Sequence, residues 1–122
     1  MVVRCIKISI DADDPYIINR DMRDFLRIGD EYIVYGIRMK LNKSIYFMVF
    51  DGNHLVEVPS PMFEIIDGRV SSLWVVQNEG DNIRLWPELF YEDDFLENFS
   101  EWEDRERKKF EKLKQYFEKA SQ

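Results

Sequence analysis

The chain has 122 residues, a formal net charge of −7, and a composition that is 45% hydrophobic and 15% aromatic. This composition excludes a disordered chain, and the length predicts one domain with a single core. The acidic balance argues against binding to nucleic acid or to an anionic membrane, because both depend on Lys and Arg to neutralise phosphates. No apolar run approaches the about 18 residues that span a bilayer, and no signal-peptide core follows Met1, so we expect a soluble, cytoplasmic protein.

The first predicted element is a strand over residues 2–10, where apolar and polar side chains alternate. We expect Ile6, Ile8 and Ile10 to face the core. The single cysteine, Cys5, lies in the same alternation. It has no partner for a disulfide within the chain, and we expect it to fill the core.

Residues 11–15 are rich in aspartate and end in a proline, and they break the first strand. The sequence leaves the conformation of residues 12–28 open between a short helix and an irregular segment. Its expected buried residues are Phe25, Leu26 and Ile28.

The central part of the chain predicts an antiparallel meander of short strands separated by turns that contain glycine. Gly36 interrupts the first of these strands, and a glycine within a strand is typical of a bulge or a tight bend. Asp51-Gly52 is the strongest turn signal, because glycine supplies the positive φ that tight hairpins need. The apolar run from Ile45 to Phe50 indicates a strand that is covered on both faces. The predicted strands span residues 31–41, 44–50, 55–58, 62–66, 70–77 and 83–86.

Beyond residue 87 the pattern changes to helix. Pro87 fits the first turn of a helix that runs to about Asn98. The sequence SEWE from Ser100 is typical of a capping box and predicts the start of a second helix. The fold class is therefore α+β: a small, strongly bent antiparallel β-sheet or SH3-like barrel over residues 1–87, followed by two C-terminal helices over residues 88–120.

The most informative feature is the acidic stretch from Glu88 to Asp104, which contains eight acidic residues and no Lys or Arg. A surface that only kept the domain soluble would usually mix both signs of charge. Large aromatic residues lie between the acids, and this mixture is typical of protein interfaces. We therefore expect a binding surface for a basic protein; the alternative is a solubilising helix surface whose aromatic residues belong to the core. The candidate partner-binding residues are Trp86, Glu88, Tyr91, Glu92, Asp93, Asp94, Glu97 and Trp102.

No motif indicates catalysis, a metal site or a cofactor. The only histidine, His54, follows a hairpin turn and is expected in an exposed loop; a nucleophilic pair with Cys5 would lack a third, orienting group. The sequence has neither the ligand spacing of a zinc site nor a glycine-rich phosphate loop. Carboxylates are numerous, but a carboxylate enzyme needs two of them in a cleft with separated pKa values. We expect a protein that is not an enzyme and that needs no cofactor.

Two segments carry a resemblance to small SH3-like barrels: IGDEYIVYGI at residues 28–37, and PMFEIIDGRVS at residues 61–71 with Trp74 after it. Together they are similar to small bacterial proteins of polymorphic-toxin and contact-dependent growth inhibition loci. Proteins of that kind act as immunity proteins that bind and neutralise a cognate toxin domain. The resemblance covers residues 28–76, so the acidic stretch lies outside it, and it identifies no binding residue.

Taken with the charge, the resemblance implies a partner that grips phosphates, namely a basic RNase or DNase domain whose active site the chain occludes. The alternative function is a non-catalytic interaction module of a bacterial complex that uses the barrel rather than the helices.

Overall fold

The structure is a computed structural model, and it describes residues 1–11, 21–41 and 44–120. It has an α+β fold in which antiparallel strands precede the helices, as the sequence predicts. The strands are β1 (Val2–Cys5), β2 (Glu31–Ile33), β3 (Gly36–Lys40), β4 (Ile45–Phe50), β5 (Leu55–Pro59), β6 (Phe63–Asp67), β7 (Trp74–Glu79) and β8 (Asn82–Pro87). The helices are the 3-10 turns η1 (Ser60–Met62) and η2 (Glu88–Tyr91) and the α-helices α1 (Phe95–Ser100) and α2 (Asp104–Ala120).

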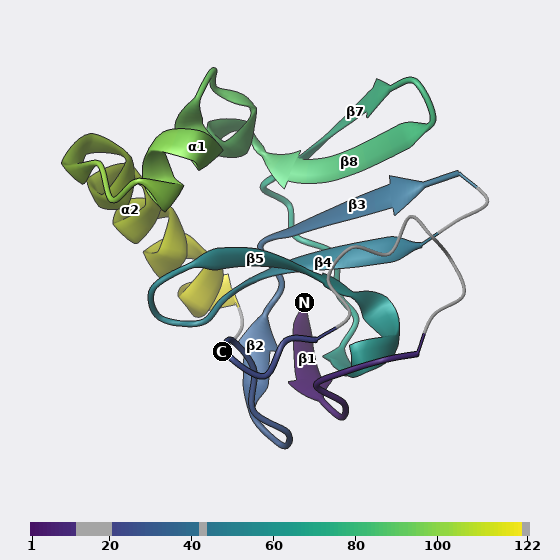
Figure 1. The fold of residues 1–122 in the computed structure, drawn as a ribbon. Coiled ribbons are helices and arrows are strands. Elements are labelled where there is room, and N and C mark those ends of the chain that lie inside the picture. Colours follow the sequence, from purple (N-terminus) through teal and green to yellow (C-terminus); the bar gives the residue numbers. More distant parts are fainter. Residues whose placement is uncertain (12–20, 42–43, 121–122) are drawn as a thin grey trace.

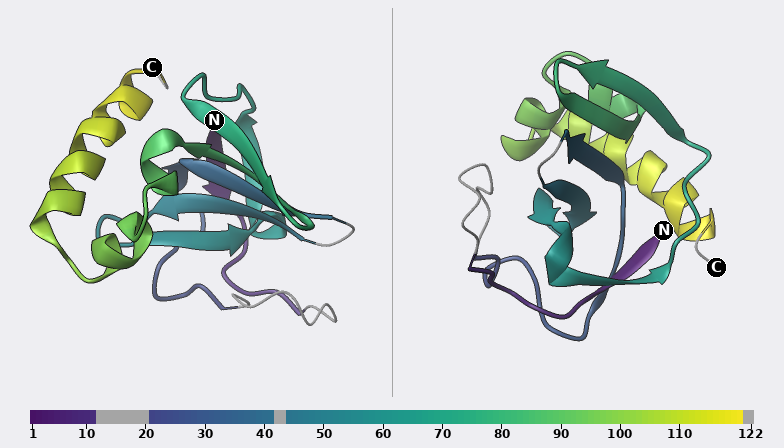
Figure 2. Two further views of the ribbon diagram at one scale, coloured as in Figure 1. Left: turned by 90° about the horizontal axis from the view of Figure 1, so that it is seen from above. Right: turned by 90° about the vertical axis from the view of Figure 1, so that its right-hand side faces the viewer.

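The strands form two antiparallel sheets. The larger has the order β5-β4-β3-β8-β7, and the smaller has the order β2-β1-β6. Figure 1 shows β1 and β2 running steeply across the direction of β3, β4 and β5, with α1 and α2 gathered at one end of the larger sheet. In Figure 2, α2 lies along the outside of the molecule as a separate layer.

The first strand of the predicted meander is two strands, β2 and β3, in different sheets. The backbone N–H of Val34 donates to the carbonyl oxygen of Met1 at 3.0 Å, whereas that of Tyr35 donates to the carbonyl oxygen of Met48 at 2.8 Å. The chain therefore passes from the three-stranded to the five-stranded sheet between these two residues. Gly36 is the first residue of β3, so the single continuous strand is wrong, and the break lies just before the predicted glycine and not at it.

Two clusters of buried side chains fill the spaces beside the larger sheet. The first includes residues of both sheets and contains Cys5, which is fully buried as predicted. The second combines the larger sheet with the helices and is rich in aromatic rings. Its buried members are Tyr35, Met48, Trp86, Phe90, Phe95, Phe99, Phe110 and Phe117.

The N-terminal strand is shorter than predicted, and different residues face the core. β1 ends at Cys5, and the backbone N–H of Ile6 then donates to the carbonyl oxygen of Met62 at 2.9 Å. Val3 and Cys5 are buried, whereas Ile6 is 43% exposed. The predicted orientation of Ile6 is therefore wrong, because successive side chains point to opposite faces and Val3 and Cys5 already face the core.

The segment before β2 is irregular where it is described, and most of the break predicted at residues 11–15 lies outside the described residues. Leu26 is buried and Phe25 is partly buried, as expected. Ile28 was expected in the core, but its side chain is exposed in the turn that leads into β2.

The predicted turn at Asp51-Gly52 is confirmed as a hairpin between β4 and β5. Gly52 has a φ of +107°, and the carboxylate of Asp51 accepts hydrogen bonds from the backbone N–H groups of Asn53 and His54 at 2.8 and 2.6 Å. β4, which leads into this turn, is buried on both faces, as its continuous apolar run predicts. The turn between β7 and β8 also contains a left-handed glycine, Gly80.

The helical region is more interrupted than predicted. Pro87 ends β8 instead of opening a helix, and only a 3-10 turn follows it. Asp94 and Trp102 adopt left-handed backbone conformations with φ of 61° and 63°, and they lie before α1 and α2. The hydroxyl of Ser100 donates to the carbonyl oxygen of Glu97 within α1, so the predicted capping box does not start the second helix, which begins at Asp104.

Candidate partner-binding surface

All eight acidic residues of the acidic stretch are exposed. Glu92 forms an ion pair with Lys109 at 2.9 Å, and it is the only one of the eight with an ion pair to another described residue. The remaining seven carboxylates therefore face solvent without a neutralising partner in the described part of the chain. This surface presents a concentrated negative potential, which attracts cationic partners.

Six of the eight predicted contact residues line one concave region, here called the acidic hollow, of about 360 Å³. It lies where β8, η2 and α1 meet. Its lining includes the predicted residues Trp86, Tyr91, Glu92, Asp93, Asp94 and Glu97. Glu88 and Trp102 do not line it, although both are exposed. The structure therefore brings together six of the eight predicted contact residues, and the other two lie outside the acidic hollow.

One cation is built into the wall of the acidic hollow. The guanidinium of Arg84 lies 4.9 Å from the ring centroid of Trp86 and 5.3 Å from that of Tyr91. It also forms an ion pair with Glu79 at 3.3 Å. A guanidinium over an aromatic face is a favourable cation–π arrangement, so the rings of Trp86 and Tyr91 already bind a cation of the chain itself.

Trp86 is a buried residue of the second core cluster. Its side chain is only 7% exposed, and its ring packs on Phe90 and Tyr91. Trp86 therefore forms the floor of the acidic hollow, and its contact with a partner stays a prediction.

Tyr91 is half-buried, and its hydroxyl braces the edge of the larger sheet. The hydroxyl oxygen lies 2.7 Å from the carbonyl oxygen of Val75 in β7 and 2.9 Å from that of Arg84 in β8, and it donates its proton there. Burial raises the pKa of Tyr91. The structural role of its hydroxyl leaves only part of the ring available to the hollow.

Trp102 is the one predicted aromatic that is well exposed, at 55%. The guanidinium of Arg107 lies between two rings, 3.6 Å from the centroid of Phe99 and 3.7 Å from that of Trp102. Arg107 also donates to the backbone carbonyl oxygens of Phe99 and Asn53, and burial lowers its pKa. These contacts fix the exposed indole against the start of α2.

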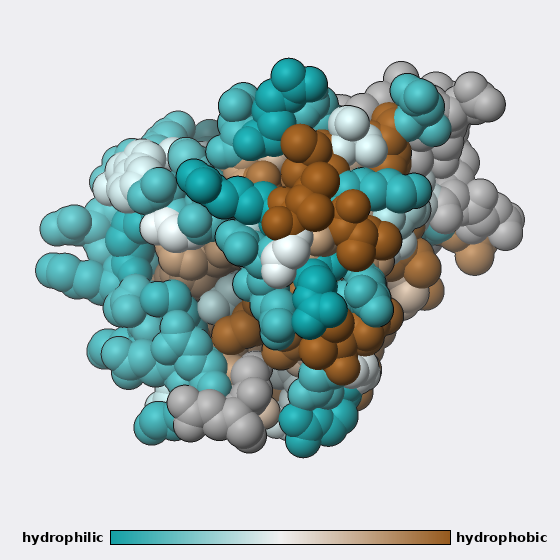
Figure 3. Space-filling view, turned by 90° about the horizontal axis from the view of Figure 1, so that it is seen from below, coloured by the Kyte–Doolittle hydropathy of each residue, from teal (hydrophilic) through white to brown (hydrophobic). Residues whose placement is uncertain are grey.

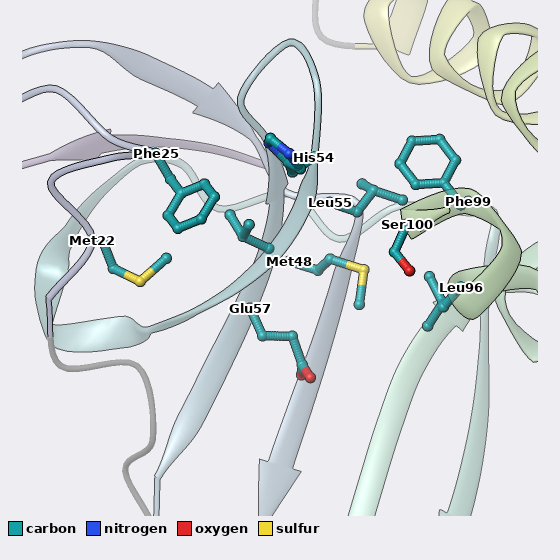
Figure 4. A pocket seen from close by; sticks show the side chains of 10 residues that line it. Met22, Phe25, Met48, His54, Leu55, Glu57, Leu96, Phe99 and Ser100 are labelled. Atoms are coloured by element: carbon teal, nitrogen blue, oxygen red, sulfur yellow. The ribbon is translucent and has the colours of Figure 1, made fainter. Parts of the chain in front are cut away.

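The sequence prediction missed an apolar pocket of about 400 Å³, shown in Figure 4. Met22 and Phe25 lie on one side of it, β4 and β5 contribute its middle, and α1 closes the other side. The pocket is lined by Met22, Phe25, Met48, His54, Leu55, Val56, Glu57, Leu96, Phe99 and Ser100. Because these residues come from three separate parts of the chain, no local spacing in the sequence could have revealed the pocket.

Cys5 and His54, the two residues considered for a nucleophilic pair, lie in different surroundings. Cys5 is fully buried, its thiol lies 3.2 Å from the carbonyl oxygen of Lys7, and burial raises its pKa. His54 is exposed, and its ring lies 3.3 Å from the carboxylate of Asp51. Within residues 1–11, 21–41 and 44–120, no three metal-ligating side chains converge.

Comparison of the chain with protein-family models, with curated proteins and with solved structures gives no match. None of the helices in the described ranges is long and apolar enough to cross a membrane. The class defined by fold and surface is thus an acidic α+β domain, and its most distinctive feature is the acidic stretch with two adjoining cavities.

Proposed function

We propose that this chain is an immunity protein that binds a basic toxin domain, one that cleaves RNA or DNA, and occludes its active site. The observation that carries the proposal is the exposure of all eight carboxylates of the acidic stretch, seven of them without a neutralising partner in the described chain. A nuclease must be basic where it grips phosphates, so a row of carboxylates offers it the charge pattern of its own substrate. The resemblance of residues 28–76 to immunity proteins supports the same function.

The size of each interaction decides what the acids contribute. An exposed ion pair stabilises a complex by only about 0–1 kcal/mol. The acidic stretch would therefore mainly accelerate association, toward about 10⁸ M⁻¹s⁻¹ at low salt. Tight binding would additionally need one or two buried apolar contacts of at least about 2 kcal/mol each.

The proposal is tested by rescue of a cell that produces the toxin. If a secreted protein is encoded next to this chain, its C-terminal domain is the toxin domain to express, alone and with the chain. We expect the wild-type chain to restore growth and the variant Asp93→Lys to restore less of it. Asp81→Lys is the matched control, because Asp81 is also exposed but lies in the turn between β7 and β8. Growth that no version of the chain restores would contradict the immunity function.

A second candidate function is an interaction module that uses the sheets. The face seen from below in Figure 3 carries apolar side chains interrupted by polar ones. Strand β6, at the edge of the three-stranded sheet, exposes Ile65 and Ile66. Exposed apolar residues on an edge strand are a feature of strand-pairing surfaces. This candidate is favoured if Ile65→Lys abolishes binding to a partner and Asp93→Lys does not.

A further inference from the structure

We infer that the apolar pocket is the anchor site of the proposed interface and that it takes a large apolar side chain from a basic segment of the partner. This inference rests on the proposed function, because it assumes that the acidic stretch meets a cationic surface. It adds the position at which binding affinity would arise and the kind of peptide sequence that would fit.

The two cavities lie on either side of one short helix. Leu96 in α1 lines both the apolar pocket and the acidic hollow. α1 has six residues, which corresponds to a length of about 9 Å. Because Leu96 borders both cavities, a single extended segment of a few residues can place one side chain in the pocket and another in the hollow.

The chemistry of the two cavities divides the side chains between them. Most of the pocket lining is apolar or aromatic, and its one carboxylate, Glu57, is engaged by Arg38 at 2.7 Å. The hollow is instead bordered by exposed carboxylates such as Asp93 and Glu97. The cationic side chains of a partner therefore suit the hollow, and an apolar side chain suits the pocket.

The size and the lining of the pocket fit such an anchor. A cavity of about 400 Å³ is in the range that accepts a small organic group. Met22 and Met48 lie in its wall, and the flexible thioether of methionine adapts to apolar groups of different shape. Figure 4 shows Phe25 and Phe99 on opposite sides of the apolar pocket.

Trp102 extends the rim of the pocket toward solvent. The ring of His54, which lines the pocket, contacts Phe25 and Trp102 edge-on, with centroids 5.6 and 6.2 Å apart. Arg107 holds the exposed indole by stacking on it. A rigid, exposed tryptophan beside a pocket is typical of an interface hot spot, because little side-chain freedom remains to be lost on binding.

The test uses a random dodecapeptide library displayed on phage as the probe. We expect the enriched peptides to combine Lys or Arg residues with a Phe, Trp, Leu or Met. Ser100→Phe places a ring in the pocket, and we expect it to weaken the binding of a selected synthetic peptide by about tenfold or more. Ser100→Ala is the matched control, because it removes the same hydroxyl and leaves the pocket open. We expect its affinity to stay within about twofold of the wild type.

Circular dichroism and a urea titration establish that Ser100→Phe is folded. If it is not, Leu96→Ala replaces it, because it removes the wall shared by the two cavities and adds no bulk. We expect Leu96→Ala to lower the affinity for the selected peptide several-fold.

The outcomes separate the inference from the proposed function. Enriched peptides that are basic but lack an apolar residue, or that bind Ser100→Phe as tightly as the wild type, overturn the inference and leave the acidic surface standing. If Ser100→Phe lowers the affinity for the peptides but Asp93→Lys does not, the result supports the pocket as the anchor site and contradicts the acidic docking surface. Absence of any enrichment overturns the inference, and growth rescue then decides on the proposed function by itself.

Discussion

Trp86 packs against Gly36 so closely that a β-carbon at position 36 would lie 2.7 Å from Cδ1 and 3.2 Å from Nε1 of the indole. Gly36 is the first residue of β3, directly after the chain passes between the sheets, and Trp86 lies on the neighbouring strand β8. The indole occupies the volume that a side chain at position 36 would need. This close approach sets the floor of the acidic hollow.

Replacement of Gly36 by Ala should therefore destabilise the fold. The new methyl group overlaps the indole of the buried Trp86. Overpacking of this kind typically lowers the free energy of unfolding by about 1–3 kcal/mol. The measurement is the free energy of unfolding in urea. Gly68→Ala is the control, because its nearest atom, Ile65 Cγ2, lies at an ordinary contact distance of 3.6 Å. Equal effects of the two replacements would contradict the packing described for Trp86.

Arg107→Lys should destabilise the protein even though it keeps the positive charge. The planar guanidinium of Arg107 stacks between Phe99 and Trp102 and donates to two backbone carbonyl groups, and an ammonium cannot reproduce both interactions. We expect a loss of about 1–3 kcal/mol in the free energy of unfolding. Arg105→Lys, at an exposed position of the same helix, should change it by less than about 0.5 kcal/mol. A loss for Arg107→Lys no larger than for Arg105→Lys would show that the stack does not hold α2.

Tyr91→Phe should lower the free energy of unfolding by about 0.5–1.5 kcal/mol, because it removes the hydroxyl that bonds to the carbonyl groups of β7 and β8. The exposed Tyr116 provides the control replacement, Tyr116→Phe, which should have little effect. Thermal or urea unfolding of both variants measures the difference. If Tyr91→Phe is as stable as the wild type yet binds the partner less well, its hydroxyl belongs to the interface and not to the sheet.

The turn residue Asp51 predicts a specific dependence of stability on pH. Burial alone would raise the pKa of its carboxyl group, but the backbone N–H groups of His54 and Asn53 and the ring of His54 outweigh it, so the pKa is lowered. A carboxylate with a depressed pKa stabilises the fold above its unfolded pKa of about 3.9, and this stabilisation is lost as the pH falls through the folded value.

Asp51→Asn removes this titration. The difference in the free energy of unfolding between the wild type and Asp51→Asn should be largest above about pH 5 and should shrink below about pH 4. Urea titrations at several pH values measure it. A difference that stays constant down to about pH 2 would contradict the role of the Asp51 carboxylate in the turn.

Sequence patterns predicted those features of the fold that depend on residues close together in the chain. The hairpin at Asp51-Gly52 depends on the positive φ that glycine adopts easily, and the continuous apolar run of β4 predicts its burial on both faces. The broken helices were not predicted. Their interruptions occur at Asp94 and Trp102, and a left-handed conformation at residues other than glycine leaves little trace in the sequence.

The candidate site was predicted in its charge but not in its shape. Exposure of the acids follows from a run without bases, whereas burial of Trp86 depends on Gly36, which lies fifty residues earlier in the chain. The apolar pocket is lined by residues as distant in the chain as Met22 and Phe99. Such long-range packing is decided by the tertiary fold and cannot be inferred from local periodicity.

The most direct test of the central claim is the association rate constant of the chain with the toxin domain, measured by stopped-flow fluorescence at ionic strengths from about 20 mM to about 500 mM. If the acidic stretch meets a cationic surface, the rate constant should fall by about tenfold or more over this range, and Asp93→Lys should lower it at low salt. A rate constant that stays unchanged with salt and with Asp93→Lys would contradict the account.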